Sequence, residues 1–216
     1  MAKKSDKKIL ITRKFPYPLF DILNENFHIE YLNNEEPLPR QTLLKLIRYC
    51  DGVVCSLNDK IDEKLIRNSK HLKIISTYSV GYDHIDLRYT RKRNIVVTNT
   101  PDVLTDSTAD LTIGLLLSVA RNINVGHSLI FSKKWKQSWT PNFLLGSELK
   151  DKTLGIIGFG KIGKSLFNLT RGFDLKYLIY DINFDSDYLK YDKVEYCTLD
   201  NLLANSDIVS IHANLT

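Results

Sequence analysis

The sequence has few of the features that mark disulfide-stabilised, membrane or secreted proteins. Its 3 cysteines among 216 residues are an odd number without CxxC or Cys/His spacing, which indicates neither a disulfide framework nor a zinc site. The longest apolar run, residues 111–120, falls well short of the roughly 20 residues of a membrane helix. The apolar stretch after the basic start covers only residues 9–12, too little for a secretory h-region. We therefore expect a cytoplasmic protein with reduced thiols and no membrane partner.

The excess of positive charge is confined to the start of the chain. Six of the 30 Lys and Arg lie in residues 1–14 beside a single Asp, and this segment accounts for the whole net charge of +5. The remainder is neutral, which argues against a nucleic-acid partner. A solvated basic terminus is the simpler interpretation. Hydrophobic residues at 43% and charged residues at 25% indicate a folded globular chain.

Short apolar runs alternate with amphipathic stretches from residue 8 onward, a pattern typical of a parallel sheet with crossover helices. It predicts a compact α/β domain of flavodoxin-like type over about residues 1–100. The expected strands are 8–12, 28–32, 52–56, 73–79 and 95–99. The expected helices are 17–24, 40–49, 62–68 and 84–92.

A domain boundary is expected at residues 99–102, where Pro101 favours extended backbone and Asp102 can cap a helix. Residues 103–130 then predict one long helix, apolar nearly all round and therefore buried. Residues 133–150 predict an irregular connection that contains Trp135 and Trp139. These indoles either cover a local core or form an oligomer contact.

Six of the ten glycines fall within residues 146–172. Residues 153–157 predict a buried strand, 158–163 read GxGxxG, and 161–171 predict a helix. A second strand, 176–180, ends in Asp181, 18 residues after Gly163. Strand, glycine turn, helix and acidic residue in this order are typical of dinucleotide-binding domains. Further strands are expected near 194–197 and at 208–212, with a helix near 199–204 between them.

The glycines suit the binding of a pyrophosphate by helix-terminal N–H groups. Gly158 allows the tight turn, Gly160 leaves room for the phosphate, and Gly163 lets the helix lie close to the strand. Asp181 can accept both ribose hydroxyls of NAD and repels the 2′-phosphate of NADP, which favours NAD. The alternatives are a glycine turn without a ligand and a plain solvated aspartate.

None of the five histidines is paired by local sequence with an acidic residue in a way that specifies a catalytic base. For each of them a surface or packing role is the simpler interpretation. They are His28, His71, His84, His127 and His212.

Two segments, SVGYDHID at 79–86 and NTPDVLTDSTADL at 99–111, closely resemble the D-isomer-specific 2-hydroxyacid dehydrogenases. The resemblance continues through Trp135, Trp139, KTLGIIGFGKIG at 152–163 and SDIVSIH at 206–212, and so covers nearly the whole chain. Within the family the chain looks most like the glyoxylate/hydroxypyruvate reductases. The resemblance implies NAD(P)H-dependent reduction of a small 2-oxoacid to the D-2-hydroxyacid.

The resemblance also implies a flavodoxin-like substrate domain, 1–100, and an interdomain helix with a partial Rossmann dinucleotide-binding domain, 101–216. The substrate carboxylate would meet backbone N–H groups near Val80 and Gly81, with Ser79 nearby. The cofactor contacts carried over are Gly158, Phe159, Gly160, Lys161, Ile162, Gly163, Asp181, Ala213 and Asn214. Asn214 departs from the family, which commonly has proline there.

In this family the catalytic arginine, glutamate and histidine follow the segment in which this chain ends, so no catalytic residue is assigned. His212 matches a structural strand-end histidine. We expect an N-terminal part of a reductase that is inactive by itself and homodimeric in full-length form. The alternative from another class is a non-catalytic NAD-binding or dimerising module, as in the co-repressor relatives of the family.

Overall fold

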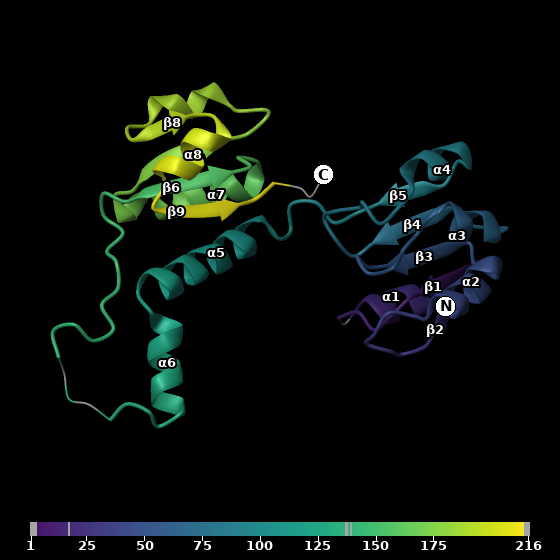
Figure 1. Cartoon of the computed structure of the whole chain (residues 1–216). Coiled ribbons are helices and arrows are strands. Elements are labelled where there is room, and N and C mark those ends of the chain that lie inside the picture. Colours follow the sequence, from purple (N-terminus) through teal and green to yellow (C-terminus); the bar gives the residue numbers. More distant parts are fainter. Residues whose placement is uncertain (1–3, 17, 137, 139, 214–216) are drawn as a thin grey trace. The chain divides into compact units, whose positions relative to one another are not determined.

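The chain divides into two compact units, each with its own sheet and core. The computed structural model describes residues 4–16, 18–136, 138 and 140–213. Unit 1 is Met1–Asp102 and unit 2 is Val103–Thr216 (Figure 1). Both units are α/β with parallel sheets, which confirms the predicted fold class.

Unit 1 is built on a five-stranded sheet in the order β2-β1-β3-β4-β5, with every neighbouring pair parallel. This is the order of flavodoxin-like sheets. The strands are β1 (Lys8–Ile11), β2 (His28–Tyr31), β3 (Gly52–Cys55), β4 (Ile74–Thr77) and β5 (Val96–Thr98). The helices are α1 (Leu19–Asn26), α2 (Arg40–Leu46), which continues into the short 3-10 helix η1 (Ile47–Tyr49), α3 (Glu63–Asn68) and α4 (Leu87–Lys92).

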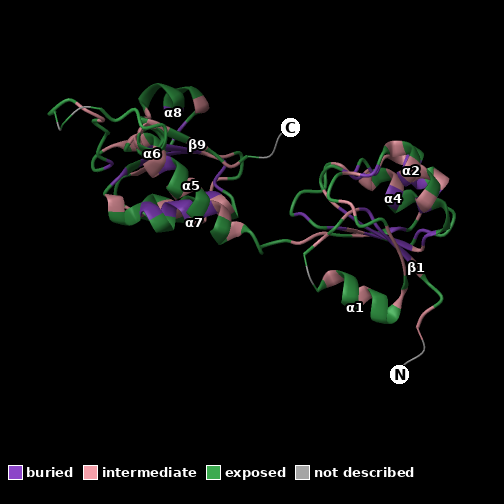
Figure 2. Ribbon diagram, turned by 90° about the horizontal axis from the view of Figure 1, so that it is seen from below, coloured by how far each residue is buried: buried purple, intermediate pink, exposed green. Residues whose placement is uncertain are grey.

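Helices cover both faces of this sheet because alternate strand residues point to opposite sides. Leu10 packs in the larger core, to which α2 and α3 contribute, whereas Ile9 and Ile11 pack with side chains of α1. Helix α1 itself has no buried residue (Figure 2). It therefore covers its face of the sheet with half-buried side chains.

The helix expected over 84–92 begins only at Leu87, so its predicted start was wrong. Asp86 caps it by accepting a hydrogen bond from the Tyr89 N–H at 2.9 Å. Before the cap, Ile85 forms an isolated parallel bridge with Ile61. His84 consequently lies in a loop at the carboxyl end of the sheet rather than in the helix.

Unit 2 carries a four-stranded parallel sheet in the order β8-β7-β6-β9. This order corresponds to strands 3-2-1-4 of a Rossmann sheet. The strands are β6 (Thr153–Ile157), β7 (Lys176–Tyr180), β8 (Val194–Tyr196) and β9 (Ile208–Ile211). The helices are α5 (Thr105–Ala120), α6 (Ile123–Phe131), α7 (Lys161–Thr170) and α8 (Leu199–Asn205), with the short 3-10 helices η2 (Arg171–Phe173) and η3 (Ser186–Lys190).

The single buried helix expected over 103–130 was wrong on two counts. It breaks between α5 and α6 at Asn122, whose φ is 54°, and the two helices are bent by 71°. The break is held by the returning chain, because Ser147 N–H donates to the Ala120 carbonyl and the Asn122 amide donates to the Leu145 carbonyl. Helix α5 packs on α7 through Ala109 and Leu116, but its opposite side is exposed.

The described part of 133–150 contains no helix or strand, as expected. Trp135 is half-exposed, and its ring lies 5.7 Å from that of Phe143. Trp139 lies outside the described residues, and an interface role for either indole stays a prediction. Among the described residues no single helix has the length and apolarity to cross a membrane. Only the bent pair of α5 and α6, counted together, has that length and composition.

Candidate functional site

The glycine turn of unit 2 joins β6 to α7, and its first glycine has a backbone that other residues rarely adopt. Gly158 has φ +89°, and its N–H donates to the Tyr180 carbonyl of β7 at 2.8 Å. A Cβ at Gly163 would lie 2.4 Å from the Gly158 carbonyl oxygen. Gly158 is therefore required by its backbone conformation, and Gly163 by the close approach of α7 to the turn.

Gly160 differs from these two because a Cβ there would meet no atom within 4 Å. It is the N-cap of α7, where no side chain caps the helix. The first helical bond runs from Lys164 N–H to the Gly160 carbonyl, so helical bonds leave the preceding N–H groups of the first turn unused. The turn thus presents open space and helix-terminal donors at one place, an arrangement that suits a phosphate.

Asp181 at the end of β7 lies directly against this turn. Its carboxylate accepts the Phe159 N–H at 2.5 Å and the Asn183 N–H at 2.7 Å. The Tyr196 hydroxyl donates to the Asp181 carbonyl at 3.1 Å. The carboxylate is therefore held in place by backbone donors and keeps lone pairs for further hydrogen bonds.

The end of β9 meets the same turn from its other side. A Cβ at Gly158 would come within 2.6 Å of the Ala213 nitrogen, so the two backbones touch. His212 N–H donates to the Ile157 carbonyl, and its Nε2 lies 2.9 Å from the Ser210 hydroxyl. Burial lowers the pKa of His212. Asn214, expected to contact the cofactor, lies outside the described residues.

The remaining predicted cofactor residues differ in what they present. Phe159 is buried, with its ring edge-to-face on Tyr188 at 4.8 Å, so only its backbone faces the turn. Ile162 is half-buried and Lys161 is exposed. The structure thus brings together residues 158–163, Asp181 and Ala213, within unit 2.

The predicted substrate loop, Ser79 to Gly81, lies after β4 in unit 1. Ser79 is buried, and its hydroxyl donates to the Gly81 carbonyl at 2.7 Å. Val80 and Gly81 are exposed, and neither backbone N–H donates to an acceptor within the described part of the chain. The loop therefore offers two adjacent donors to solvent.

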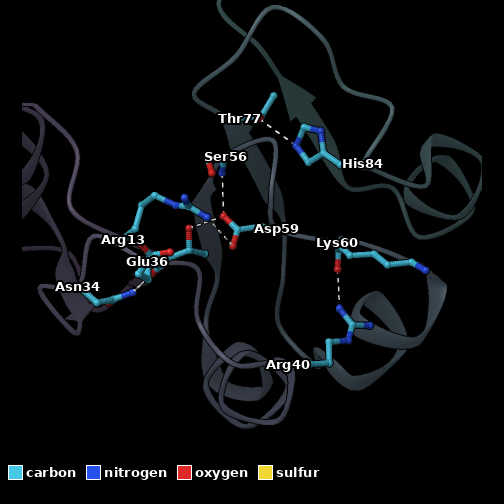
Figure 3. A network of polar contacts seen from close by, with 10 residues as sticks. Arg13, Asn34, Glu36, Arg40, Ser56, Asp59, Lys60, Thr77 and His84 are labelled. Carbon is cyan, nitrogen blue, oxygen red and sulfur yellow. Dashed lines mark hydrogen bonds and ion pairs between the residues drawn. The ribbon is translucent and has the colours of Figure 1, made fainter. Parts of the chain in front are cut away.

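A largely buried polar network that local sequence did not reveal lies at the carboxyl ends of the neighbouring strands of unit 1 (Figure 3). Thr77 Oγ1 lies 2.7 Å from Ser79 Oγ and 3.0 Å from His84 Nε2. Asp59 is 2% exposed and accepts the Thr12 hydroxyl at 2.6 Å and the Ser56 N–H at 2.8 Å. Arg13 forms an ion pair with Asp59 at 3.4 Å.

These residues share one signal that sequence reasoning could have used. They end or follow β1, β3 and β4, and the carboxyl ends of parallel strands meet at one edge of a sheet. Ligands of open α/β sheets bind at this edge. Polar residues that directly follow three adjacent strands therefore indicate this edge from the sequence alone.

We expect acidification to destabilise unit 1 through His84. Burial lowers the His84 pKa against the opposing effect of Asp59 and Asp83, and its Nδ1 is buried without a hydrogen-bond partner. The unfolded state then binds the proton more readily, so the stability from this group is full above about pH 6.5 and is lost as pH falls through the folded pKa.

An NMR titration of the His84 ring should therefore give a midpoint below 6.5. Urea unfolding of unit 1 should depend less steeply on pH in His84→Gln than in wild type. His71→Gln, at an exposed histidine of the same unit, is the control. A His84 midpoint at or above 6.5 would contradict the expectation.

All three cysteines are free and buried, as expected of packed thiols. Burial raises the pKa of Cys50 to about 11 and that of Cys55 to about 12. Both thiols therefore stay protonated at neutral pH and are no nucleophiles in the folded chain.

A groove of about 910 Å³ runs between α5 and the edge strand β9. Its apolar walls include Leu111, Leu115 and Val119 of α5 and Ile211 of β9, all more than half exposed. Within the described residues β9 pairs only with β6. Unit 2 thus has an uncovered apolar side next to its glycine turn.

A family model described as the catalytic domain of D-isomer specific 2-hydroxyacid dehydrogenases matches residues 9–210. A glyoxylate reductase of Thermofilum pendens is 43% identical over 97% of this chain and 62% of that protein. A glyoxylate reductase of Thermococcus litoralis is 42% identical over 97% of this chain and 64% of its own. The chain therefore spans a little under two thirds of the length of these curated relatives.

Solved structures agree with this match. A crystal structure of a Thermus thermophilus protein superposes with a TM-score of 0.89 at 36% identity, covering 97% of this chain and 65% of that one. The Aquifex aeolicus D-lactate dehydrogenase, complexed with NAD and lactic acid, has a TM-score of 0.81 at 28% identity, covering 97% and 61%. Both similarities extend over both units.

Proposed function

The chain belongs to the D-isomer-specific 2-hydroxyacid dehydrogenases, and we propose that it forms the cofactor- and carboxylate-binding parts of an NADH-dependent reductase of glyoxylate or hydroxypyruvate. The observation that carries this is the glycine turn of unit 2, with open space at Gly160 and a fixed carboxylate at Asp181. The likeness to curated glyoxylate reductases supports the substrate class.

The residues present fit a dinucleotide with a free 2′-hydroxyl. The turn has space where the pyrophosphate would approach, and the first N–H groups of α7 make no intrahelical bond. Asp181 can accept the ribose hydroxyls, whereas a 2′-phosphate would meet its negative charge. Lys164, in the first turns of α7, is engaged by Asp185 at 2.9 Å. NAD is therefore favoured over NADP.

When bound, NADH would supply the hydride that reduces the carbonyl carbon of the 2-oxoacid, with a proton going to the carbonyl oxygen. This chain's own contribution is to hold the two reactants. The Val80 and Gly81 N–H groups bind and orient the carboxylate, with Gly81 allowing close approach. The first turn of α7 and Asp181 hold the cofactor. By family resemblance we assign neither the proton donor nor the oxoacid-binding arginine to a residue of this chain.

The proposal is tested by two measurements on the 216-residue chain. Titration with NADH, followed by its fluorescence, should show saturable binding, and titration with NADPH weaker binding. Oxidation of NADH in the presence of glyoxylate, followed at 340 nm, should be absent or very slow. Failure to bind NADH would overturn the proposal; rapid turnover would contradict the placement of the catalytic residues.

Asp181→Asn should shift the cofactor preference. A hydrogen bond to a charged group contributes about 1.5–3 kcal/mol, so loss of the charge should weaken NADH binding roughly tenfold or more. NADPH binding should be unchanged or tighter, because the repulsion of the 2′-phosphate is removed. Both affinities are read by fluorescence titration.

Asp187→Asn removes the same charge from an exposed position in the following 3-10 helix and serves as the matched control. It should leave the NADH/NADPH affinity ratio within about twofold of wild type. A ratio in Asp181→Asn that equals that of the control would show that Asp181 does not select the cofactor.

The partner most compatible with unit 2 is a second copy of the protein. Helix α6 has no buried residue although it is largely apolar, and Ile130 and Phe131 are more than half exposed. Such apolar surface is typical of association sites. We propose a homodimer in the cytoplasm, which light scattering and cell fractionation test.

A second candidate function is a non-catalytic NAD-binding module. The glycine turn and the fixed Asp181 carboxylate support this candidate as well, because they account for cofactor binding alone. NADH binding without turnover in a full-length protein would support this candidate. Turnover of glyoxylate by full-length protein would exclude it.

A further inference from the structure

Three hydrogen bonds engage the carbonyl oxygens of the Ser79–Gly81 loop, two from neighbouring residues of unit 1 and one from within the loop. Thr100 N–H donates to the Ser79 carbonyl at 2.9 Å. The Asn99 side-chain amide donates to the Val80 carbonyl at 2.8 Å, and the Ser79 hydroxyl to the Gly81 carbonyl at 2.7 Å. Every carbonyl of the loop is thus engaged.

The geometry of the peptide unit makes these bonds informative about the loop's donors. A trans peptide is planar, and its C=O and N–H point in opposite directions. Holding the Ser79 carbonyl inward therefore turns the Val80 N–H outward. Holding the Val80 carbonyl inward does the same for the Gly81 N–H. Neither of these two N–H groups donates to an acceptor among the described residues.

The bond from the Ser79 hydroxyl to the Gly81 carbonyl is the last of a series of hydrogen bonds whose directions follow from one another. Ser79 has a single hydroxyl proton, which it gives to the Gly81 carbonyl, so in the 2.7 Å contact between Thr77 and Ser79 it is Thr77 that donates. The single hydroxyl proton of Thr77 is then engaged in its bond to Ser79. In its 3.0 Å contact with His84, the ring must therefore donate from Nε2.

This direction determines the state of His84. Its Nε2 carries a proton, and its Nδ1 is buried without a hydrogen-bond partner. A protonated Nδ1 would leave a charged donor unsatisfied, which costs more than a bare lone pair. The ring is therefore neutral, and burial lowers its pKa in the same sense. Cys55, which also contacts Thr77, stays protonated because burial raises its pKa to about 12.

We propose that Asn99, together with the Thr77–His84 pair, acts as a positioning device that keeps the Val80 and Gly81 N–H groups turned outward to receive the carboxylate of the substrate. This inference rests on the proposed function, which assigns the carboxylate to these two donors. Neither Asn99 nor the pair touches the substrate. Asn99 sets the Gly81 N–H directly. Thr77 and His84 act indirectly: the Ser79 hydroxyl that they anchor holds the Gly81 carbonyl, whose peptide carries the Tyr82 N–H, and so fixes the backbone on the far side of Gly81.

The test uses the 216-residue chain and glyoxylate, with sodium chloride at equal ionic strength as the blank. Backbone amide signals of Val80 and Gly81 are followed by NMR during the titration. Asn99→Leu removes the donor at similar volume. Thr77→Val interrupts the series of hydrogen bonds, and Thr77→Ser restores the hydroxyl. NADH affinity, which depends on unit 2, is measured for each variant as the check on the fold.

We expect Asn99→Leu and Thr77→Val to weaken glyoxylate binding roughly three- to tenfold, the effect of one hydrogen bond. Thr77→Ser should recover wild-type affinity within about twofold. NADH affinity should change less than twofold in all three. Without ligand, the Val80 and Gly81 amide signals should already move in Asn99→Leu, because the loop is no longer held.

The outcomes separate the inference from the function it rests on. Wild-type binding that persists unchanged in Asn99→Leu and Thr77→Val overturns the positioning device and leaves the carboxylate site intact. A wild-type chain whose Val80 and Gly81 signals do not respond to glyoxylate overturns the carboxylate site itself. Loss of NADH binding in a variant marks a folding defect, and Asn99→Ala and Ser79→Ala then replace it in the same comparison.

Discussion

Gly160→Asp should weaken NADH binding by at least about a hundredfold and leave the chain as stable as wild type, or slightly more so. A Cβ at this position meets no atom within 4 Å, and the backbone there, φ −73° and ψ −157°, is open to any residue. Aspartate is among the preferred N-cap residues and interacts favourably with the helix dipole. The same carboxylate would stand where the pyrophosphate approaches, and two charges about 4 Å apart repel by about 4 kcal/mol near a protein surface.

Gly172→Asp is the matched control. It introduces the same charge in the same unit, at a glycine whose Cβ would also meet no atom within 4 Å. Fluorescence titration should find its NADH affinity within about threefold of wild type. If Gly160→Asp binds NADH as well as this control, the glycine turn does not hold the pyrophosphate.

Gly158→Ala should destabilise unit 2 by about 3 kcal/mol or more. An alanine with φ +89° is strained by about 1–3 kcal/mol. Its Cβ would lie 2.6 Å from the Ala213 nitrogen and 2.7 Å from the His212 carbonyl carbon, both backbone atoms that cannot rotate away, and overpacking costs a further 1–3 kcal/mol or so.

Urea unfolding followed by tryptophan fluorescence reads this effect selectively, because both tryptophans belong to unit 2. Unit 1 should unfold as in wild type when followed through its own NMR signals. Gly172→Ala, which adds a Cβ in open space, is the control. Equal tryptophan midpoints for Gly158→Ala and Gly172→Ala would contradict the role assigned to the turn.

The sheets could be predicted because their signals are local. Apolar runs such as 52–56 and 153–157 are short, bounded by turn residues and repeated at regular spacing, and the structure has a strand at each. The glycine turn was recognisable for the same reason: strand, GxGxxG and helix adjoin in sequence. Asp181 could be placed because it directly ends the next strand.

The break in the expected long helix could not be predicted, because the contacts that hold it come from a later segment of the chain. The apolar periodicity runs on through Asn122, and the contacts that hold the break come from Leu145 and Ser147 on the returning chain. The exposed side of α5 was missed similarly. A helix that is apolar on every side is expected to be buried, but the sequence does not say which element covers each side of it.

The polar network at the carboxyl ends of β1, β3 and β4 was missed because its partners are far apart in sequence. Arg13 and Asp59 are separated by 46 residues, and neither belongs to a motif. Among the histidines, His84 could not be told from the others, since its partner Thr77 is a hydroxyl of the preceding strand and not an acid. Only the parallel register of the strands brings these groups to one edge.

The burial of the three thiols makes them internal reporters of opening. Two of them, Cys50 and Cys55, lie in the core of unit 1, and Cys197 lies in unit 2. A thiol reagent reacts with such groups only when the surrounding structure opens. Mass spectrometry of peptides after timed labelling in graded urea therefore assigns each modification to its unit. One sample then gives the free energy of opening of each unit, without the introduction of an artificial probe.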